Sequence, residues 1–228
     1  MSSGATHIEI EERDVDVPLS QLGHEQAEAV AQWFGRLSPD QTPEVILTSP
    51  YQRAKDTAAS IRTACKQAEG PIHFVVDERL REKEFGVLDR LTREGIEKLY
   101  PDQSEFRRLL GKFYHRPPGG ESWCDVILRL RSALDTMSLH HGGKRVLIVA
   151  HQVVVLCLRY LIEDMTEQQI LDIDAEGDVA NCSVTEYRFK ADQGAVSELE
   201  LLRYNFVAPL EHEGTPVTSE PDANVAAR

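Results

Sequence analysis

Apolar residues along the chain either recur on one helical face or gather in short continuous runs. Ala27, Val30, Ala31, Phe34 and Leu37 show the helical spacing and predict a helix over residues 20–37. Similar patterns predict helices after Pro50 as far as about residue 66, and over residues 92–100, 103–114, 122–137 and 153–162. Short apolar runs predict strands over residues 44–48, 72–76, 145–150, 183–189 and 199–204.

Strands and helices alternate over most of this order, which is typical of a mostly parallel sheet covered by helices on both sides. After Arg145, residues 146–150 are continuously apolar, as in a strand that helices bury on both faces. We therefore expect an α/β fold, a three-layer α/β/α sandwich, over residues 19–207. Residues 1–18 show no apolar periodicity and predict an irregular segment. Residues 208–228 hold three prolines among polar residues and predict a disordered tail.

Charge narrows the classes of partner. Among 228 residues, 25 basic and 38 acidic side chains give a formal net charge of −13, which repels nucleic-acid backbones and anionic lipid. No apolar run approaches about 18 residues, and the first residues lack the basic and apolar run of a signal peptide. The sequence predicts a cytoplasmic protein with no nucleic-acid or membrane partner, and it leaves the oligomeric state open.

Metal ligands are poorly arranged in the sequence. His140 and His141 are adjacent, so on a helix their side chains point about 100° apart, and no third ligand follows at a suitable spacing. The four cysteines are far apart and form no C-x-x-C pair. We expect reduced thiols, no metal and no cofactor.

Candidate chemistry lies where predicted strands end, because ligands of parallel α/β sheets bind at the carboxyl ends of strands. Arg53 falls in the first turn of the helix after the 44–48 strand, where a helix N-terminus and a guanidinium together suit an anion. His151 directly follows the 145–150 strand, and Glu82 lies in the loop after the 72–76 strand. Each alone is ordinary: a surface arginine, a structural histidine, a solvated carboxylate. Together they place an anion binder, an imidazole and a carboxylate at one sheet edge.

These residues also carry a family resemblance. Six motifs occur in family order: Pro18-Leu19-Ser20-x-x-Gly23-x-x-Gln26-Ala27, Thr48-Ser49-Pro50-x-x-Arg53-Ala54-x-x-Thr57, Leu80-x-Glu82-x-x-Phe85-Gly86, Pro118-Gly119-Gly120-Glu121-Ser122, Val149-x-His151 and Asn181-Cys182-Ser183. Over residues 15–189 the chain resembles the histidine phosphatase superfamily, also called phosphoglycerate mutase-like. The run from Arg116 to Ser122, with Asp125, Arg129 and His151-Gln152, is most similar to the fructose-2,6-bisphosphatase type and to bacterial phosphatases like it.

The resemblance implies roles for individual residues. Arg53 and a protonated His151 would bind the transferring phosphoryl group, and Glu82 would be the general acid, for which its pKa would need to be raised by Glu84 or by burial. The resemblance also implies that Arg53, Tyr114, Arg116 and Gln152 bind the substrate, a small phosphorylated metabolite. Four cations and no acid between residues 106 and 120 favour an ester with further anionic groups.

The departures from the family pattern matter equally. The family nucleophile is a histidine in an Arg-His-Gly motif that ends the first, internal strand, and no Arg-His-Gly occurs in these 228 residues. The resemblance therefore implies a sandwich without its first internal strand, in which two neighbouring strands would be unpaired. Arg90 also replaces a family glycine. The predicted function is phosphomonoester hydrolysis or mutase-like transfer through a phosphohistidine, with the nucleophile absent from the chain as written. Two accounts stay open: a late start site in an ordinary enzyme, favoured by the retained Arg53, Glu82 and His151, or a truncated, non-catalytic phospholigand-binding or interaction protein.

Overall fold

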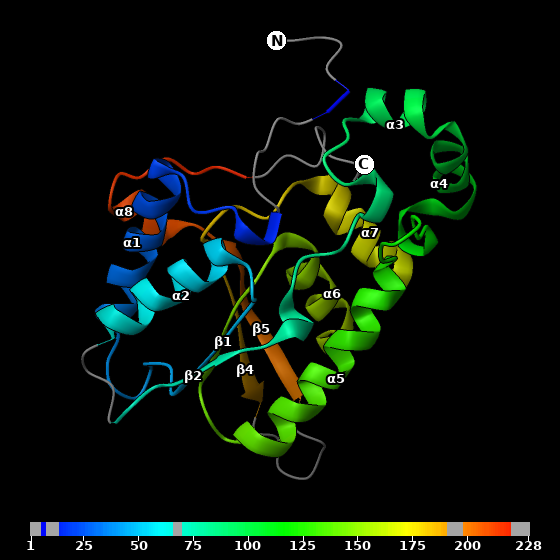
Figure 1. Cartoon of the computed structure of the whole chain (residues 1–228). Coiled ribbons are helices and arrows are strands. Elements are labelled where there is room, and N and C mark those ends of the chain that lie inside the picture. The colour runs from blue at the N-terminus through cyan, green and yellow to red at the C-terminus, as the bar shows by residue number, and fades with distance from the viewer. Residues whose placement is uncertain (1–5, 8–13, 66–69, 191–197, 220–228) are drawn as a thin grey trace.

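The computed structural model describes residues 6, 7, 14–65, 70–190 and 198–219. Within them, a central sheet of three strands has the order β2-β1-β3, and a second sheet consists of β4 and β5 (Figure 1). The strands are β1 (Val45–Thr48), β2 (His73–Val76), β3 (Val146–Val149), β4 (Val184–Lys190) and β5 (Glu198–Phe206). The predicted α/β fold with a mostly parallel sheet is confirmed.

Strand β1 is the middle strand of the parallel sheet, with β2 on one edge and β3 on the other. Val45 lies opposite His73 of β2 and Val146 of β3, and all three strands run in the same direction. All four residues of β1 are buried, as expected for a strand with neighbours on both edges and helices on both faces. The carboxyl ends of the three strands therefore meet at one edge of the sheet.

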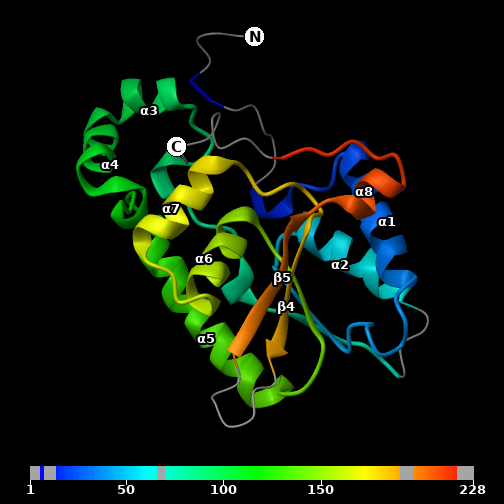
Figure 2. The ribbon, with the colours of Figure 1, turned by 180° about the vertical axis from the view of Figure 1, so that it is seen from behind.

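Helices cover both faces of the strands, as the two opposite views show (Figures 1 and 2). One side carries α1 (Gln21–Gly35), α2 (Gln52–Ala64) and α8 (Ala208–His212), and the other carries α5 (Trp123–His141), α6 (Gln152–Ile162) and α7 (Glu167–Glu176). The helices α3 (Arg93–Leu99) and α4 (Pro101–Tyr114) lie together beyond α7, and three short 3-10 helices are η1 (Asp14–Asp16), η2 (Glu78–Leu80) and η3 (Gly86–Leu88).

The alternation of side chains along β1 divides the core into two layers. Val45 and Leu47 point into the cluster formed with α5 and α6, whereas Ile46 points into the cluster formed with α1 and α2. This period of two is the geometry of an extended strand. The arrangement is the predicted α/β/α sandwich.

The strands do not form one continuous sheet. β4 pairs with β5 in antiparallel fashion, and among the described residues neither of them pairs with β3. A cleft of about 1810 Å³ lies between the two sheets and is lined by residues of both β3 and β4. It continues to the carboxyl end of the parallel sheet, where Arg53, Glu82 and His151 line it.

The prediction of a disordered tail from residue 208 is wrong as far as residue 219. Leu210 of α8 is fully buried, and Gln26 of α1 donates hydrogen bonds to the Pro216 carbonyl oxygen and to Oγ1 of Thr218. Pro209 sits in the first turn of α8, a position that tolerates proline because its missing N–H would have no helical partner. The polar composition of this segment gave no sign that Pro209 and Leu210 would be buried. Residues 220–228 lie outside the described part of the chain.

Candidate active site

Two strand ends place Ser49 and His151 in contact. Ser49 follows β1, and His151 follows β3 as the N-cap residue of α6. The Oγ of Ser49 lies 2.7 Å from Nε2 of His151, and the ring of Tyr51 meets the imidazole edge-on at a centroid distance of 4.9 Å. Only 8% of His151 is exposed, so its orientation is fixed on several sides.

Hydrogen-bond logic assigns the tautomer of this imidazole. Nδ1 of His151 faces the Glu82 carboxylate, which favours a proton on Nδ1, and the Ser49 hydroxyl, which accepts from the Tyr51 backbone N–H, then donates its own proton to Nε2. The remaining ring proton then lies on Nδ1. Burial, together with Arg53 and Arg129, holds the pKa of His151 well below its ordinary value. This lowered pKa favours the neutral imidazole when no anion is bound, whereas the family resemblance implied a protonated His151 on a bound phosphoryl group.

Nδ1 of His151 faces the carboxylate of Glu82 across 3.9 Å. Oε1 of Glu82 accepts a hydrogen bond from the Lys83 backbone N–H at 2.7 Å, which holds the carboxyl group close to the backbone of its own loop. The side chain of Glu82 keeps 16% of its surface exposed. A proton donor for a leaving group needs this combination of a fixed position and partial access.

Arg53 reaches the same end of the cleft from the first turn of α2. Its Nη1 donates hydrogen bonds of 2.9 Å to both the carbonyl oxygen and Oδ1 of Asp14, and its guanidinium lies over the Tyr51 ring at 4.8 Å. The side chain is 23% exposed. Asp14 therefore occupies donors that would otherwise be available to an anion.

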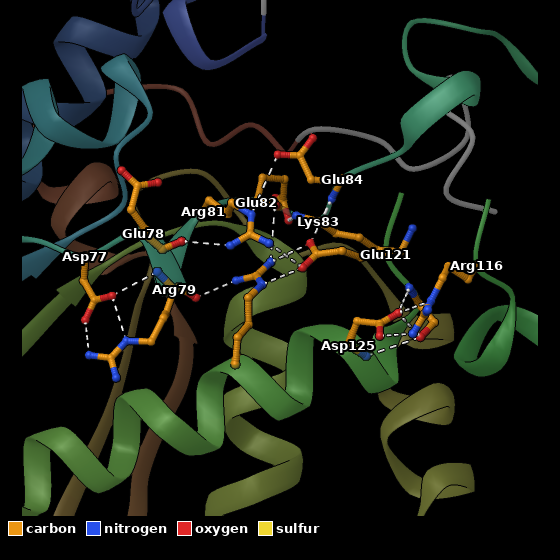
Figure 3. Close-up of polar contacts among 12 residues, drawn as sticks. Asp77, Glu78, Arg79, Arg81, Glu82, Lys83, Glu84, Arg116, Glu121 and Asp125 are labelled. Atoms are coloured by element: carbon orange, nitrogen blue, oxygen red, sulfur yellow. Dashed lines mark hydrogen bonds and ion pairs between the residues drawn. The ribbon is translucent and has the colours of Figure 1, made fainter. Parts of the chain in front are cut away.

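Glu121 fixes the loop that carries Glu82. Its carboxylate accepts hydrogen bonds from Arg81 at 2.8 Å, from Nε of Arg129 at 2.9 Å and from the backbone N–H of Glu84 at 3.1 Å. Arg129 also donates to the carbonyl oxygen of Glu82 at 3.3 Å. Figure 3 shows Glu121 beside Arg81 and Glu82. These charge-assisted bonds hold the loop from both sides of the candidate acid.

Lys83 is a buried cation next to this carboxylate. Only 6% of it is exposed, and its Nζ lies 4.3 Å from the centre of the Phe85 ring. Burial and the nearby Arg107 lower the pKa of Lys83 to about 8, although Glu82 and Glu121 act in the opposite direction. A buried ammonium of this kind suits an anionic ligand group that would share the site.

In the loop after Glu82, Arg90 adopts a backbone conformation that is typical of glycine. Arg90 has a φ of 61°, in the left-handed region where a Cβ atom is crowded by the backbone. The departure noted in the sequence thus leaves the path of the chain in the conformation that glycine favours.

Three predicted substrate-binding residues either lie outside the cleft or form hydrogen bonds with other parts of the protein. Tyr114 donates a hydrogen bond to Glu167 at 2.6 Å. Arg116 pairs with Asp125, well away from Glu82 in the close-up (Figure 3). Neither lines the cleft. Gln152 does line it, but its amide oxygen accepts from the Val179 N–H at 3.1 Å.

The structure adds residues that the sequence argument did not assign. Ser49 stands in the Thr48-Ser49-Pro50 motif, directly after a strand, so its position at the sheet edge could have been inferred. Asp14 has no such signal, because its contact with Arg53 joins segments 39 residues apart. Among the described residues, no group of three or more metal-binding side chains occurs, and no helix is long and apolar enough to cross a membrane.

Comparison with known proteins supports the reading of these motifs. Residues 4–201 match the model of the histidine phosphatase superfamily (branch 1). The chain belongs to the histidine phosphatase superfamily. The resemblance inferred from the six motifs is confirmed.

Relatives within the superfamily carry names of mutases and phosphatases. The chain is 36% identical over 145 residues to a probable phosphoglycerate mutase of Yersinia enterocolitica, which covers 63% of this chain and 62% of that protein, so the chain matches less than two thirds of that relative. It is 29% identical over 198 residues to a 2,3-bisphosphoglycerate-dependent phosphoglycerate mutase of Gloeobacter violaceus, covering 85% and 84%. A mycobacterial glucosyl-3-phosphoglycerate phosphatase superposes with a TM-score of 0.67 at 25% identity, covering 88% and 94%.

Proposed function

We propose that this site binds the phosphoryl group of a small phosphomonoester and stabilises it during transfer, while the histidine that would form the phosphohistidine in this family is absent from the chain as written. Arg53 and His151 hold the phosphoryl oxygens, and Glu82 donates the proton to the leaving oxygen. A phosphoryl group in transfer carries its charge on three equatorial oxygens, so positioned donors stabilise it without covalent help. Phosphomonoester hydrolysis and mutase transfer share this step.

The observation that supports the proposal most is the meeting of three chemistries at one end of the cleft. The guanidinium of Arg53, Nδ1–H of His151 and the carboxyl group of Glu82 come from three separate strand ends and line the same cleft. A bound dianion would displace Asp14 from Arg53 and would raise the pKa of His151 by its charge. The protonated imidazole expected from the sequence would then form with the ligand.

The proposed substrate carries a second anionic group. Two relatives are named for phosphoglycerates, and Lys83 offers a buried cation beside Glu82. Tyr114, Arg116 and Gln152 remain proposed substrate contacts, and for Arg116 this requires release from Asp125. If Arg116 contributes to specificity, Arg116→Ala lowers kcat/KM for phosphoglycerates relative to an uncharged aryl phosphate. An unchanged ratio removes Arg116 from the substrate site.

The nucleophile is the open point of the mechanism. The sequence has no Arg-His-Gly. In space, Ser49, His151 and Glu82 are arranged like the serine, histidine and carboxylate of a hydrolase triad. Ser49 is fully buried, however, so its hydroxyl cannot approach a phosphorus atom. Binding of a phospholigand without turnover is therefore the second candidate function. We expect the 228-residue chain to hydrolyse no aryl phosphate measurably, since loss of a nucleophile costs about 10⁶ in kcat in a well-studied hydrolase.

Anion protection tests the site itself. Phosphate or vanadate should raise the thermal unfolding temperature of the protein, and Arg53→Ala and His151→Ala should each remove most of that effect. Arg36→Ala is the matched control, because Arg36 pairs with Glu213 on the surface. Equal protection of all four proteins would exclude the proposed pocket, and protection with no turnover would favour the second candidate function.

A further inference from the structure

Two histidines from distant segments of the chain meet at the far end of the parallel sheet from the candidate site. His73 is the first residue of β2, and His141 is the last residue of α5. Their ring centroids lie 5.8 Å apart, with an angle of 66° between the ring planes. The candidate site lies where the parallel strands end, so the length of a strand, about 13 Å, separates it from this pair.

The fold gives His141 a neighbour that the sequence does not show. Along the chain its closest histidine is His140, whose side chain points about 100° away around the helix. That geometry made the adjacent pair a poor metal site. His73 comes from the edge strand of the parallel sheet, so spacing along the chain could not have revealed its contact with His141.

One nitrogen of His141 is buried without a partner. Among the described side chains that are not exposed, Nδ1 of His141 is the only buried nitrogen or oxygen with no hydrogen bond. Such an atom has lost water and gained nothing in its place, which is unfavourable until a partner arrives. Burial, together with His73 and Lys144, lowers the pKa of His141. At neutral pH the ring is therefore neutral, the form in which imidazole binds metals.

The spacing of the two rings suits a shared metal ion. A zinc ion lies about 2 Å from an imidazole nitrogen and hence about 3.2 Å from the centroid of that ring. Two rings on one tetrahedral ion therefore have centroids about 5 Å apart. The observed 5.8 Å is within about 1 Å of that separation. His73 is exposed, so its ring can turn about its last side-chain bond to direct a nitrogen at the ion.

The donor atoms select the class of metal. Imidazole nitrogen suits Zn²⁺, Ni²⁺ and Cu²⁺, whereas Mg²⁺ and Ca²⁺ prefer oxygen ligands. Among the residues that the structure describes, no third histidine, cysteine or carboxylate joins the pair, so water would complete the coordination. Lys144 repels a cation here, while the formal net charge of −13 attracts cations to the molecule as a whole.

We propose that His73 and His141 form a binding site for one divalent transition-metal ion, such as Ni²⁺ or Zn²⁺. Nδ1 of His141 and one ring nitrogen of His73 are the protein ligands. The bound ion connects the edge strand β2 to the carboxyl end of α5, and metal binding to the folded form stabilises it. The ion lies too far from Arg53 and Glu82 to take part in the proposed phosphoryl chemistry.

Titration calorimetry with Ni²⁺ tests the site, because imidazole suits nickel whereas thiolates select softer ions. We expect one ion to bind per chain. His73→Gln and His141→Gln should each weaken binding by about tenfold or more. His140→Gln is the matched control, since His140 is exposed and adjacent to His141, and it should leave the affinity unchanged. Mg²⁺ should produce no measurable heat of binding.

Thermal unfolding and NMR provide two further measurements. Nickel at about 100 times its dissociation constant should raise the unfolding temperature of the parent by about 5 °C or more, with no rise for His73→Gln. Zn²⁺, which is diamagnetic, should shift the imidazole nitrogen signals of His73 and His141 and leave those of the other histidines in place.

Three results would overturn the proposal. The first is equal nickel affinity of the parent and His73→Gln, which keeps the test valid even if His141→Gln does not fold, because His73 is exposed. The second is loss of binding in His140→Gln. The third is binding of several ions per chain with the same affinity, which would show only scattered surface histidines.

Discussion

Ser49 and His151 are joined by a 2.7 Å hydrogen bond between Oγ and Nε2, although 102 positions separate them in the chain. Pairing of β1 with β3 brings the two residues together, because Ser49 directly follows β1 and His151 lies two residues beyond the end of β3. The hydroxyl therefore acts as a positioning group: it directs Nδ1–H of His151 towards Glu82.

Removing that hydroxyl should misplace the imidazole proton. Ser49→Ala leaves Nε2 of His151 buried without its partner, which costs about 1–3 kcal/mol of unfolding free energy, and it should weaken phosphate protection. Nitrogen NMR of the imidazole should show a mixture of the two tautomers in the variant and one tautomer in the parent. A double-mutant cycle with His151→Gln provides the control, and additive effects would contradict the coupling.

Stability should depend on pH through His151. Its pKa is lowered in the folded protein and is about 6.5 in the unfolded chain. The unfolded state therefore binds more protons below about pH 7, so stability is fully present above that value and falls as the pH decreases towards the lowered pKa. The loss is at most about 1.4 kcal/mol per pH unit for one group.

Urea denaturation between pH 7.5 and 5.5 measures this dependence. His151→Gln should have a shallower decline than the parent. His115, whose pKa is also lowered by burial, contributes in the same direction, so His115→Gln is a parallel variant rather than a neutral control. Identical slopes for parent and His151→Gln would show that the pKa of His151 is not lowered in the folded protein.

Lys83 should destabilise the folded protein at neutral pH. A pKa lowered from 10.5 to about 8 means that the charged form is disfavoured by burial, by up to about 3 kcal/mol. Lys83→Met should therefore have a larger unfolding free energy than the parent at pH 7. The difference between variant and parent should be smaller at pH 10, where the lysine of the folded parent is neutral. Lys98→Met on exposed α3 is the control, with a change within about 0.5 kcal/mol. A destabilised Lys83→Met would indicate that the charge is held by favourable contacts.

Arg90→Gly should stabilise the protein modestly. The left-handed φ of 61° strains an arginine by about 1–2 kcal/mol, and the entropy of glycine in the unfolded chain offsets part of that. We expect a net gain of about 0.5–1 kcal/mol in unfolding free energy, measured by urea denaturation. Lys98→Gly, in the last turn of α3, should instead lose up to about 1 kcal/mol. A loss at Arg90 as well would mean that its side-chain contacts outweigh the strain.

The sequence predicted the parallel strands and most helices because their apolar periodicity is strong. It missed α7, whose ten residues contain few apolar positions, and α8, which is short and anchored by Leu210. Apolar periodicity also did not indicate which strands would form the parallel sheet and which the separate antiparallel pair. Pairing between strands depends on contacts across the chain, and periodicity along one segment carries no information about them.

The sequence predicted those site residues that come soon after the end of a strand. Arg53, Glu82 and His151 each follow a strand, and the structure brings them to one cleft. Asp14, Glu121 and the tautomer of His151 depend on contacts between distant segments, which spacing along the chain cannot supply. Tyr114 and Arg116 were assigned by family resemblance, and they are held by local partners outside the cleft.

The central position of β1 also governs the order in which the protein can fold during synthesis. β1 and β2 are close in the chain, so they can pair soon after both leave the ribosome. β3 follows β1 by about 100 residues, which at about 5–20 residues per second takes several seconds to synthesise. During that interval the second edge of β1 is unpaired, and a chaperone that binds apolar strands could bind there before His151 joins Arg53 and Glu82 in the active site.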